Sequence, residues 1–462
     1  MISSIPQHVG KEIFVEGWID GRRDHGKIVF FDIRDRSGKV QSVATTALES
    51  VKDVRLEAVV SVRGLVKNRP ASMVDSTNPN GSFELEIKEL AILNPSKEIP
   101  LPVEGDGYDI KEEVRMEYRY LDLRRPRLQN NLKMRSKISK HIRDFLEERG
   151  FWEVETPNLT RSTPEGARDY LVPSRLEPGH FYALPQSPQQ YKQLLMVAGV
   201  EKYFQLARCF RDEDTRGDRQ PEFTQLDLEM SFVDREDIMS LNEELLISIV
   251  EELYPDKKIQ EVPFPRLTYA EAMEKYETDR PDLRKDKEDP SLLAFCWITD
   301  FPFFEKTTNG SWTFTHNPFS APTADSKELL ETSDLEDADI KKIITNQYDV
   351  ALNGFEIGGG SIRAHKRSTL EKVLKIIGYG EKESQEKFGH MLKALDYGAP
   401  PHGGIAWGFD RLVAILQNEP NIREVIAFPK TGDGRELLTH APSEVGLDQL
   451  NELGLEIKKN KK

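Results

Sequence analysis

The chain has 462 residues and a formal net charge of −15, and only two of its residues, Cys209 and Cys296, are cysteines. This length predicts two or three domains, and two cysteines exclude a disulfide framework and a cysteine metal cluster. No apolar run reaches membrane-spanning length, and the first residues show neither a signal-peptide nor a transit pattern. We therefore expect a cytoplasmic protein without a membrane partner.

The negative charge is unevenly distributed, and taken alone it disfavours a nucleic-acid partner. Residues 1–100 contain 14 basic and 14 acidic side chains, so the rest of the chain carries the whole deficit. A neutral first domain can still hold RNA if its basic groups are clustered. Overall charge therefore leaves the partner open.

Five short segments rich in Val, Ile and Phe follow one another between residues 12 and 93: EIFVEGWI, KIVFFDIRD, KVQSVA, EAVVSVRGLV and FELEIKEL. Glycines and polar residues separate them, as expected of β-strands joined by turns. Five such strands predict a small closed barrel such as the OB-fold, whose open face commonly binds single-stranded nucleic acid. The pattern is equally compatible with a small β-barrel that lacks this role. We assign residues 1–100 to this domain.

The remainder of the chain predicts a hinge followed by a large mixed domain. Residues 101–125 are interpreted as the hinge because IPLPVEGDGY, where they begin, is rich in Pro and Gly. Residues 126–462 are expected to form an α+β domain. A helix is predicted at 132–148, where apolar residues recur at helical spacing before a glycine, and FWEVETP after it alternates like a strand. Further helices are expected at SPQQYKQLLMVAG, 237–254, 367–377 and 384–395.

The stretch FRDEDTRGDRQPEFTQLDLE, residues 210–229, places many charges between two apolar runs. In FTQLDLEM the alternation is strict, so Gln225, Asp227 and Glu229 face one side of a strand and the apolar residues face the other. We therefore expect an antiparallel hairpin with one apolar face and one charged face.

A solvated outer sheet face is the ordinary explanation for such a hairpin. Here, however, Arg211 and Glu213 are two residues apart and are predicted to share the charged face, and Phe223 lies on the same polar side. An aromatic ring close to an arginine suits a flat heterocycle that bears phosphate. The hairpin therefore indicates a nucleotide site.

The sequence FRDEDTRGDRQPEFTQLDLEMSF, within 201–232, resembles motif 2 of the class II aminoacyl-tRNA synthetases in the form found in bacterial-type aspartyl-tRNA synthetases. GGIAWGFDRLVAIL (403–416) is similar to motif 3, and the helix and strand at 132–157 are similar to motif 1. TPEGARDYLVP, ALPQSPQQYKQLLM and NGFEIGGGSIR resemble further blocks, and WIDGRRDHGKIVFFDIRDRSGKVQ resembles the anticodon-binding OB-fold of that family. The blocks keep the family's order over nearly the whole chain. The resemblance implies a catalytic domain, 126–462, built on an antiparallel sheet flanked by helices. The large domain that bacterial members usually carry between motifs 2 and 3 is absent, which accounts for the short chain.

The resemblance implies a homodimer, because motif 1 forms the subunit interface in this class. It also implies a reaction in two steps. L-aspartate attacks the α-phosphate of ATP to give aspartyl-adenylate and pyrophosphate, and the terminal adenosine of tRNA-Asp then takes the aspartyl group. The nucleophile is already a carboxylate. Catalysis therefore needs alignment and charge neutralisation, without a catalytic Ser, Cys or His.

The catalytic residues implied by the resemblance are Arg211, Glu213 and Arg411. The guanidinium of Arg211 presents a fixed fork of donors, which suits the α-phosphate and the substrate carboxylate together. Phe223 stacks under adenine, and Gly408 allows the backbone to approach the nucleotide. The implied ATP-binding residues are Arg211, Asp212, Glu213, Gln220, Phe223, Glu356, Gly408, Phe409, Asp410 and Arg411.

Mg²⁺ is implied as the metal, held by Asp349 and Glu356, because this hard cation takes oxygen ligands and bridges phosphates. From the residues alone, Asp349 could equally be a surface carboxylate in a polar loop.

Aspartate selection follows from charge, since its side-chain carboxylate requires fixed cations. The implied site consists of Glu165, Ser187, Gln189, Lys192, Arg211, Asp227, His316 and Arg363. Lys192 and Arg363 meet the side-chain carboxylate, and Asp227 orients the lysine. Asparagine leaves both cations without their anion, a loss of about 3–5 kcal/mol, so no editing domain is expected.

The implied tRNA contacts lie in both predicted domains. Phe30 stacks on an anticodon base, which contributes roughly 1–3 kcal/mol, while Arg23 and Gln41 read base edges or phosphate. Phe30 could equally be a core residue, since KIVFFD has two adjacent Phe and only one can face outward. Arg216 and Arg219, at the hairpin tip, are candidates for contact with the acceptor end.

His25 bears on the choice of tRNA. In the family, leucine is frequent at this position in enzymes restricted to tRNA-Asp, and histidine in those that also charge tRNA-Asn. We therefore expect relaxed specificity that includes tRNA-Asn, with an exposed loop histidine as the alternative.

Three other functions remain as alternatives. They are a sister synthetase for asparagine or lysine, a catalytically inactive RNA-binding relative, and an ATP-dependent ligase that acts without tRNA. TPEGARDY together with Arg363 favours aspartate. Intact Arg211, Glu356 and Arg411 oppose the loss of catalysis, and the predicted barrel opposes a ligase without tRNA.

Overall fold

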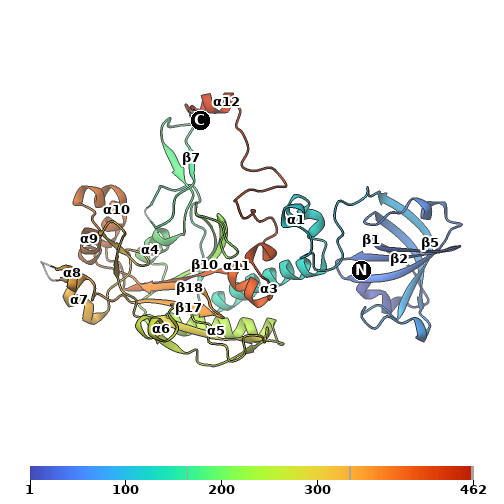
Figure 1. The fold of residues 1–462 in the computed structure, drawn as a ribbon, viewed down its shortest axis with the longest axis horizontal. Helices are drawn as coiled ribbons and strands as arrows, with labels where there is room; N and C mark the ends of the chain where they lie inside the picture. The colour runs from blue at the N-terminus through green and yellow to red at the C-terminus, as the bar shows by residue number, and fades with distance from the viewer. Residues whose placement is uncertain (164, 332–334, 459–462) are drawn as a thin grey trace. The chain divides into compact units, whose positions relative to one another are not determined.

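The computed structural model describes residues 1–163, 165–331 and 335–458, so Pro164 of the TPEGARDYLVP block lies outside the described part. The chain divides into two compact units between Pro102 and Val103 (Figure 1). No helix in the described ranges combines the length and the apolar character that a membrane span requires.

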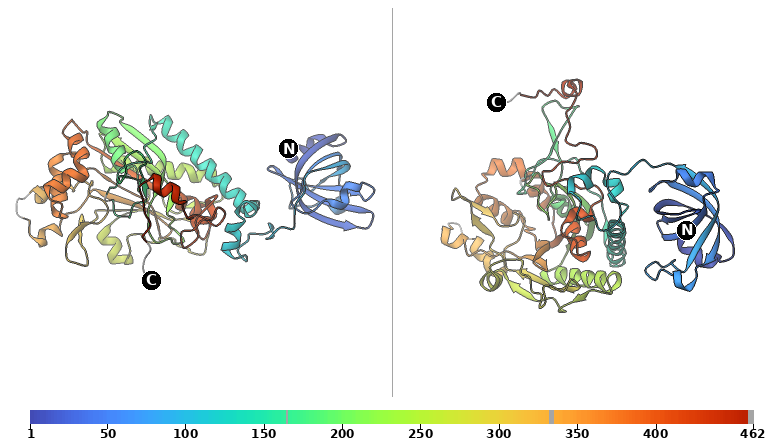
Figure 2. Two further views of the ribbon diagram at one scale, coloured as in Figure 1. Left: turned by 90° about the horizontal axis from the view of Figure 1, so that it is seen from above. Right: turned by 45° about the vertical axis from the view of Figure 1, so that its right-hand side comes forward.

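The first unit is a closed five-stranded barrel, as predicted (Figure 2). Its strands follow the order β1-β2-β3-β5-β4, with β4 returning to β1, and all pairs are antiparallel except β3 with β5. The elements are η1 (Ile2–His8), β1 (Glu12–His25), β2 (Ile28–Asp35), β3 (Gly38–Thr45), η2 (Glu49–Asp53), β4 (Val59–Asn68), η3 (Ala71–Met73) and β5 (Phe83–Asn94).

Alternation along β2 decides between the two adjacent phenylalanines of KIVFFD. Val29, Phe31 and Ile33 point into the barrel and are almost completely buried. Phe30 therefore points outward, where it is half-buried. The reading of Phe30 as a core residue is wrong.

The second unit is built on an eight-stranded sheet with the order β12-β14-β17-β18-β19-β10-β9-β6. The sheet is antiparallel from β14 to β9, as expected, but β12 and β6 pair in parallel at its two edges. The strands are β6 (Trp152–Glu153), β9 (Lys202–Phe210), β10 (Glu222–Ser231), β12 (Arg266–Thr268), β14 (Phe295–Thr299), β17 (Gln347–Leu352), β18 (Phe355–Ile362) and β19 (His402–Gly408).

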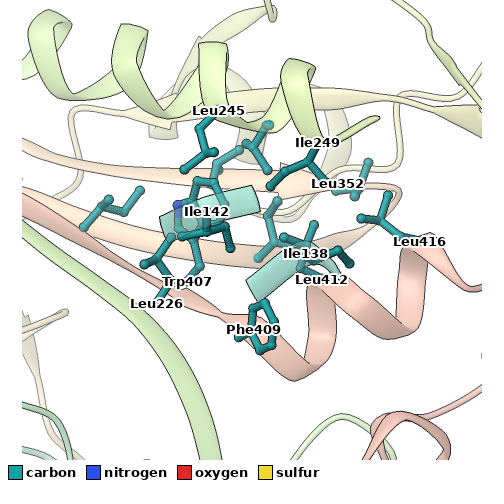
Figure 3. Close-up of a cluster of buried hydrophobic side chains, with 14 of the residues drawn as sticks. Ile138, Ile142, Leu226, Leu245, Ile249, Leu352, Trp407, Phe409, Leu412 and Leu416 are labelled. Carbon is teal, nitrogen blue, oxygen red and sulfur yellow. The ribbon is translucent and has the colours of Figure 1, made fainter. Parts of the chain in front are cut away.

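Three helices cover one face of this sheet: α3 (Pro126–Glu148), α5 (Arg235–Leu253) and α11 (Phe409–Leu416). Their apolar side chains meet Leu226, Leu352 and Trp407 of the sheet in one buried cluster (Figure 3). The predicted helices at 132–148 and 237–254 correspond to α3 and α5. α3 begins earlier, at Pro126, whose fixed φ suits a first helical position.

On the other face, α4 (Gln189–Val197) packs against β10, and α10 (Glu381–Leu395) packs against α4 and α9 (Arg367–Ile376). The remaining elements are β7 (Leu171–Pro173), β8 (Phe181–Ala183), β11 (Lys258–Ile259), α6 (Tyr269–Tyr276), β13 (Leu292–Leu293), β15 (Phe304–Lys306), β16 (Trp312–Phe314), α7 (Ala324–Glu331), α8 (Asp337–Ile340), η4 (Ile422–Val425) and α12 (Leu447–Glu452).

The segment interpreted as a hinge, 101–125, belongs from Val103 onward to the second unit and contains α1 (Glu112–Glu117) and α2 (Arg119–Asp122). The carboxylate of Asp122 accepts from three buried guanidinium groups, those of Arg115, Arg119 and Arg125. Buried charges require such pairing, and removing one partner is costly. This part of the predicted hinge is therefore anchored, and composition failed to predict it because only residues up to 107 are rich in Pro and Gly.

Only an irregular segment, 277–291, joins α6 to β13 in the region where relatives of the resembled family carry an extra domain. Gln260 holds this segment through its side-chain amide. Its Nε2 donates to the carbonyl of Leu283 at 3.0 Å, and its Oε1 accepts from the N–H of Lys285 at 2.8 Å.

Candidate active site

A cavity of about 470 Å³ lies on the sheet face opposite the apolar cluster. The alternation of β10 explains this placement, since Leu226 and Leu228 point into the cluster whereas Gln225 and Asp227 line the cavity. Most of the predicted site residues come together here: Glu165, Ser187, Gln189, Lys192, Arg211, Glu213, Arg219, Gln220, Phe223, Asp227, His316, Glu356, Arg363, Gly408, Asp410 and Arg411.

The predicted hairpin consists of β9 and β10 in antiparallel pairing, with Phe223 opposite Cys209. Alternation predicted that Arg211 and Glu213 continue the strand on its charged face. β9 ends at Phe210, however, so both residues lie in the connecting loop. Both nevertheless line the cavity. The guanidinium carbon of Arg211 lies 5.1 Å from the centre of the Phe223 ring, which gives the cavity a cation beside an aromatic face.

One end of the cavity contains two buried cations that share two buried carboxylates. Lys192 Nζ lies 2.8 Å from Asp227 Oδ1 and 3.2 Å from Glu229 Oε2, and Arg363 Nε donates to Glu229 Oε1 at 2.9 Å. All four side chains are at most 1% exposed. A Cβ at Gly404 would lie 2.1 Å from Glu229 Oε2, so glycine at this position leaves room for the network.

Glu229 was absent from the predicted aspartate-binding set. The signal was available, because alternation already placed Glu229 on the charged face with Asp227. Burial alone would raise the pKa of Glu229, but Arg363 and Lys192 hold it below its ordinary value. Burial raises the pKa of Asp227, and Lys192 offsets only part of this effect. Of the two carboxylates, Glu229 therefore keeps its negative charge more readily than Asp227.

Beside these cations lie groups suited to an ammonium and a carboxylate. Glu165 accepts from the hydroxyls of Thr163 and Ser187, each at 3.0 Å, and burial raises its pKa. The buried Nε2 of Gln189 has no hydrogen-bond partner among the described residues. Buried polar groups normally have partners, so a bound ligand is the expected partner here.

His316 faces the open cavity, so its ring remains accessible, while the protein walls around it and three cations lower its pKa to about 4. The cations are Arg363, Arg211 and Lys192. His316 is therefore neutral near pH 7 and can act as a hydrogen-bonding group.

Arg411, in the first turn of α11, donates to Asp218 Oδ2 at 3.2 Å and to the carbonyl of Glu356. It joins α11 to the loop of the hairpin and to β18 at the edge of the cavity. Gly408 directly precedes the helix and lines the same wall.

Two predicted ATP-binding residues do not line the cavity. Phe409 is 1% exposed and packs in the apolar cluster (Figure 3), with the guanidinium of Arg135 4.8 Å from its ring centre. Asp212 lies beside the cavity, where its N–H donates to the carbonyl of Arg168 at 3.0 Å. The sequence could not separate the neighbours within GFDR or FRDE, because only packing decides which of them faces the ligand.

Asp410 lines the cavity, but both of its carboxylate oxygens are occupied. Oδ2 accepts from the N–H of Thr224 at 2.8 Å, and Oδ1 accepts from Arg135 of α3. Asp410 therefore ties α11 to β10 and to α3, and its position next to Phe223 indicates support for the aromatic face rather than contact with a ligand.

Asp349 is buried in β17, so the reading of this residue as a surface carboxylate is wrong. It accepts from Gln347 Nε2, and it backs the cavity wall at Gly359, where a Cβ would lie 2.7 Å from Asp349 Oδ1. Burial raises the pKa of Asp349 well above its ordinary value, and Glu356 raises it further. Such a pair fits a cation. The described residues hold no cluster of three or more metal-binding side chains, so phosphate and water would have to supply the other ligands.

The predicted anticodon residues lie together on the outside of the barrel. Arg23 is opposite Phe30 and Gln41 is opposite Asp32 in the strand register. Arg23 pairs with Asp32 at 2.7 Å and donates to Gln41 Oε1 at 3.3 Å. The exposed His25 meets Phe30 edge-on, with ring centres 5.5 Å apart.

The backbones of Arg216 and Arg219 form an isolated antiparallel β-bridge at the tip of the hairpin, and both residues are exposed. Arg219 also pairs with Glu213 at 3.4 Å and lines the cavity, whereas Arg216 does not.

Residues 111–432 match the model of the family described as tRNA synthetases class II (D, K and N), and residues 13–93 match that of the OB-fold nucleic acid binding domain. The chain is 40% identical to the aspartate–tRNA(Asp/Asn) ligase of Moorella thermoacetica, over 96% of this chain and 94% of that protein. It is 39% identical to the aspartate–tRNA ligase of Staphylococcus saprophyticus, over 97% of each. The resemblance drawn from the motifs is confirmed.

The Moorella alignment spans 574 positions, against 462 residues in this chain, so more than a hundred positions of the relative face gaps. This agrees with an absent inserted domain. Two solved structures share the fold. One is the asparaginyl-tRNA synthetase of Pyrococcus horikoshii complexed with asparaginyl-adenylate, with a TM-score of 0.72 and 24% identity over 92% of this chain and 96% of that one. The other is the aspartyl-tRNA synthetase of Entamoeba histolytica, with a TM-score of 0.73 and 20% identity over 93% and 90%.

Proposed function

The chain belongs to the class II tRNA synthetases, and on that premise we propose that it is an aspartate–tRNA ligase, which activates L-aspartate with ATP and transfers it to tRNA-Asp. The observation that carries the proposal is the buried pair Lys192 and Arg363 at one end of a cavity that Arg211 and Arg411 also line. A cavity with this charge pattern suits a small diacid beside a nucleoside triphosphate.

The amino-acid end selects by charge. The guanidinium of Arg363 donates to Glu229, to the hydroxyl of Ser361 and to the carbonyl of Gly404, which together use four of its N–H groups. A guanidinium has five N–H donors, so at least one remains for the side-chain carboxylate of aspartate. Lys192, held by Asp227 and Glu229, supplies the second cation. Asparagine presents a neutral amide there, whose N–H groups cannot accept from the donors that Lys192 and Arg363 keep free for an anion.

The α-amino and α-carboxylate groups are bound at the other side of this subsite. The carboxyl group of Glu165 is suited to the ammonium, and the Nε2 of Gln189, which has no partner among the described residues, is a donor suited to a carboxylate oxygen. Arg211 binds the α-carboxylate and the α-phosphate together. It aligns the nucleophilic oxygen with phosphorus and neutralises the charge that builds up during attack.

The nucleotide end holds adenine on Phe223 and the phosphates between Arg211 and Arg411, with Glu213 and Gln220 near the base. We assign a Mg²⁺ site to Asp349 and Glu356. Bound there, Mg²⁺ would neutralise phosphate charge.

Amino-acid-dependent ATP–pyrophosphate exchange tests the assignment. We expect exchange with aspartate and roughly 10⁴-fold weaker exchange with asparagine, because a site built around fixed donors rejects an analogue that cannot pair with them. Exchange supported by asparagine or lysine instead of aspartate would contradict the proposal.

The contact between the exposed His25 and the outward-facing, half-buried Phe30 favours a second specificity, for tRNA-Asn in addition to tRNA-Asp. A histidine edge beside the stacking ring offers an adaptable polar contact to the base next to the stacked one. Charging of the two purified tRNAs should be compared for the wild type and for His25→Leu. We expect His25→Leu to lower charging of tRNA-Asn more than that of tRNA-Asp, whereas equal charging ratios in both proteins would exclude a role for His25.

We further propose a homodimer that works in the cytoplasm, where translation takes place. β6 is an edge strand of the sheet, and its Trp152 is 63% exposed at the end of the motif 1 segment. A large exposed aromatic at a sheet edge favours a protein contact. Sedimentation at micromolar concentration should give a dimer, and Trp152→Glu should shift it toward monomer; a monomeric wild type would contradict the proposal.

A further inference from the structure

Gln186 lies between β8 and α4, is 3% exposed, and its side-chain amide binds residues that flank Glu165. Its Oε1 accepts from the N–H of Ala167 at 2.9 Å, and its Nε2 donates to the carbonyl of Ala167 at 2.9 Å. Nε2 also donates to Asp169 Oδ1 at 2.6 Å. The amide thus pairs with both backbone groups of Ala167, as a neighbouring strand would. A carboxamide carries a donor and an acceptor at this spacing without charge.

The loop that Gln186 holds carries Glu165 into the cavity. In the described ranges, the side-chain carboxylate of Glu165 accepts hydrogen bonds only from two hydroxyls, those of Thr163 and Ser187. Its carboxylate is otherwise disfavoured by burial, which raises its pKa. Gln186 contacts residues two positions before and two positions after Glu165, the carbonyl of Thr163 at 3.4 Å and the backbone of Ala167, and so bears directly on the position of Glu165.

The main chain of Gln186 makes another contact, with Arg211, the residue proposed to bind the α-phosphate. The carbonyl of Gln186 accepts from Arg211 Nε at 3.3 Å. A second contact joins the same two segments, since the N–H of Asp212 donates to the carbonyl of Arg168 at 3.0 Å. Gln186 thus holds the Glu165 loop with its side chain and the arginine of the hairpin loop with its backbone.

We propose that Gln186 is a positioning residue for the amino-acid substrate, which holds Glu165 at the site of the α-ammonium and in register with Arg211. This inference rests on the proposed function, since it concerns the same site. Substitution of Gln186 removes the side-chain contacts and keeps the carbonyl that Arg211 uses. The aspartate side of the site should therefore suffer while the ATP side is largely spared.

Gln186→Glu tests this division with a minimal change. The introduced carboxylate cannot donate to Ala167, and it faces the carboxylate of Asp169. Loss of two buried hydrogen bonds predicts a ten- to hundredfold rise in KM for aspartate, with less than a threefold change in KM for ATP, both measured by pyrophosphate exchange.

Gln260→Glu is the matched control. Gln260 grips the segment 277–291 in the same two-sided way but does not line the cavity. It should lower thermal stability without raising KM for aspartate. The proposal is overturned if Gln186→Glu leaves KM for aspartate within twofold of the wild type. It is also overturned if both Michaelis constants rise equally, or if Gln260→Glu reproduces the aspartate effect.

A pH profile adds a readout that a purely structural role would not move. When protonated, the introduced carboxyl group regains both a donor and an acceptor, so kcat/KM for aspartate relative to wild type should recover as pH falls. Burial raises the pKa of Glu165, and its carboxylate is lost in both proteins as pH falls, so its effect cancels in the ratio. Asp169 faces the introduced carboxyl group only in the variant, so that contact is part of what the ratio measures. A ratio that stays flat as pH falls counts against the proposal.

Gln186→Met serves if the charged variant does not fold, because it keeps the side-chain length and removes every hydrogen bond that the amide makes. It should show the same selective rise in KM for aspartate and faster tryptic cleavage after the exposed Arg168. Unchanged cleavage and unchanged KM overturn the proposal. If the wild type instead uses asparagine or lysine, the proposed function fails, and KM for that amino acid still tests Gln186 separately.

Discussion

The cavity and the barrel face contain ion pairs of nearly the same length in very different surroundings. Lys192 and Asp227 are 2.8 Å apart with side chains 1% exposed, whereas Arg23 and Asp32 are 2.7 Å apart with side chains 49% and 25% exposed. Bond length is therefore a poor guide to the free energy that each pair contributes. A buried charge that loses its partner cannot be rescued by water, but an exposed one can.

The difference also separates the two tasks. In the cavity, charges are fixed by one another before the ligand arrives, so the site can discriminate carboxylate from amide. On the barrel, Arg23 and Gln41 are accessible and can exchange their mutual contacts for contacts with RNA. Substitutions in the two regions should therefore differ in size and in what they change.

The largest effect is expected for Arg363→Ala. It leaves Glu229 buried without its main cation, a penalty of about 3–5 kcal/mol, so aspartate-dependent exchange should fall roughly a thousandfold and the melting temperature should also fall. Arg367→Ala is the control, because Arg367 pairs with Glu371 and Asp396 at the surface. A similar loss of exchange activity and melting temperature in both variants would show that burial of the ion pair does not determine the size of the effect.

The adjacent phenylalanines of β2 offer a sharper comparison within the barrel. Phe31→Ala should remove about 3–5 kcal/mol from the free energy of unfolding, because the ring fills the core. Phe30→Ala should leave stability nearly unchanged and raise KM for tRNA about ten- to a hundredfold through lost stacking. Thermal unfolding and charging kinetics measure the two effects, and an exchange of these outcomes would reverse the assignment of the two faces.

Asp410→Asn probes support of the nucleotide end. The amide can still accept from the N–H of Thr224, but it no longer neutralises Arg135. We expect about a tenfold rise in KM for ATP and little change in KM for aspartate, measured by pyrophosphate exchange. A rise confined to aspartate would place Asp410 in the other half of the cavity.

The pH dependence of aspartate binding should be smaller but diagnostic. Because burial raises the pKa of Glu165, its carboxylate is lost at a higher pH than that of an ordinary glutamate as the solution is acidified. KM for aspartate should therefore rise by a few-fold as pH falls through this raised pKa. His316, with its pKa lowered to about 4, stays neutral over the same range. Glu165→Gln should give a high KM without this acid limb, and persistence of the limb would assign it to another group.

Arg23→Ala is expected to have the smallest effect. Exposed ion pairs contribute about 0.2–1 kcal/mol, so the melting temperature should stay close to that of the wild type. Charging of tRNA should weaken at most several-fold and become less sensitive to salt. A marked loss of stability would mean that the barrel depends on the Arg23–Asp32 pair as the cavity depends on its buried ion pairs.

The sequence by itself determined the barrel, the charged hairpin, the long helices and the family, because alternation and helical spacing are local properties that survive without any knowledge of packing. It also identified most of the cavity lining, since the motifs keep those residues at fixed spacing. Only the tertiary structure decided that Phe30 faces outward, that Phe409 is core, that Asp349 is buried, and that residues 103–125 are anchored. Gln186 acquires its role in the same way. For Glu229, alternation already indicated the charged face, and packing decided that it is buried with Arg363. Each of these outcomes depends on which distant side chains exclude water from a position, and no local pattern contains that information.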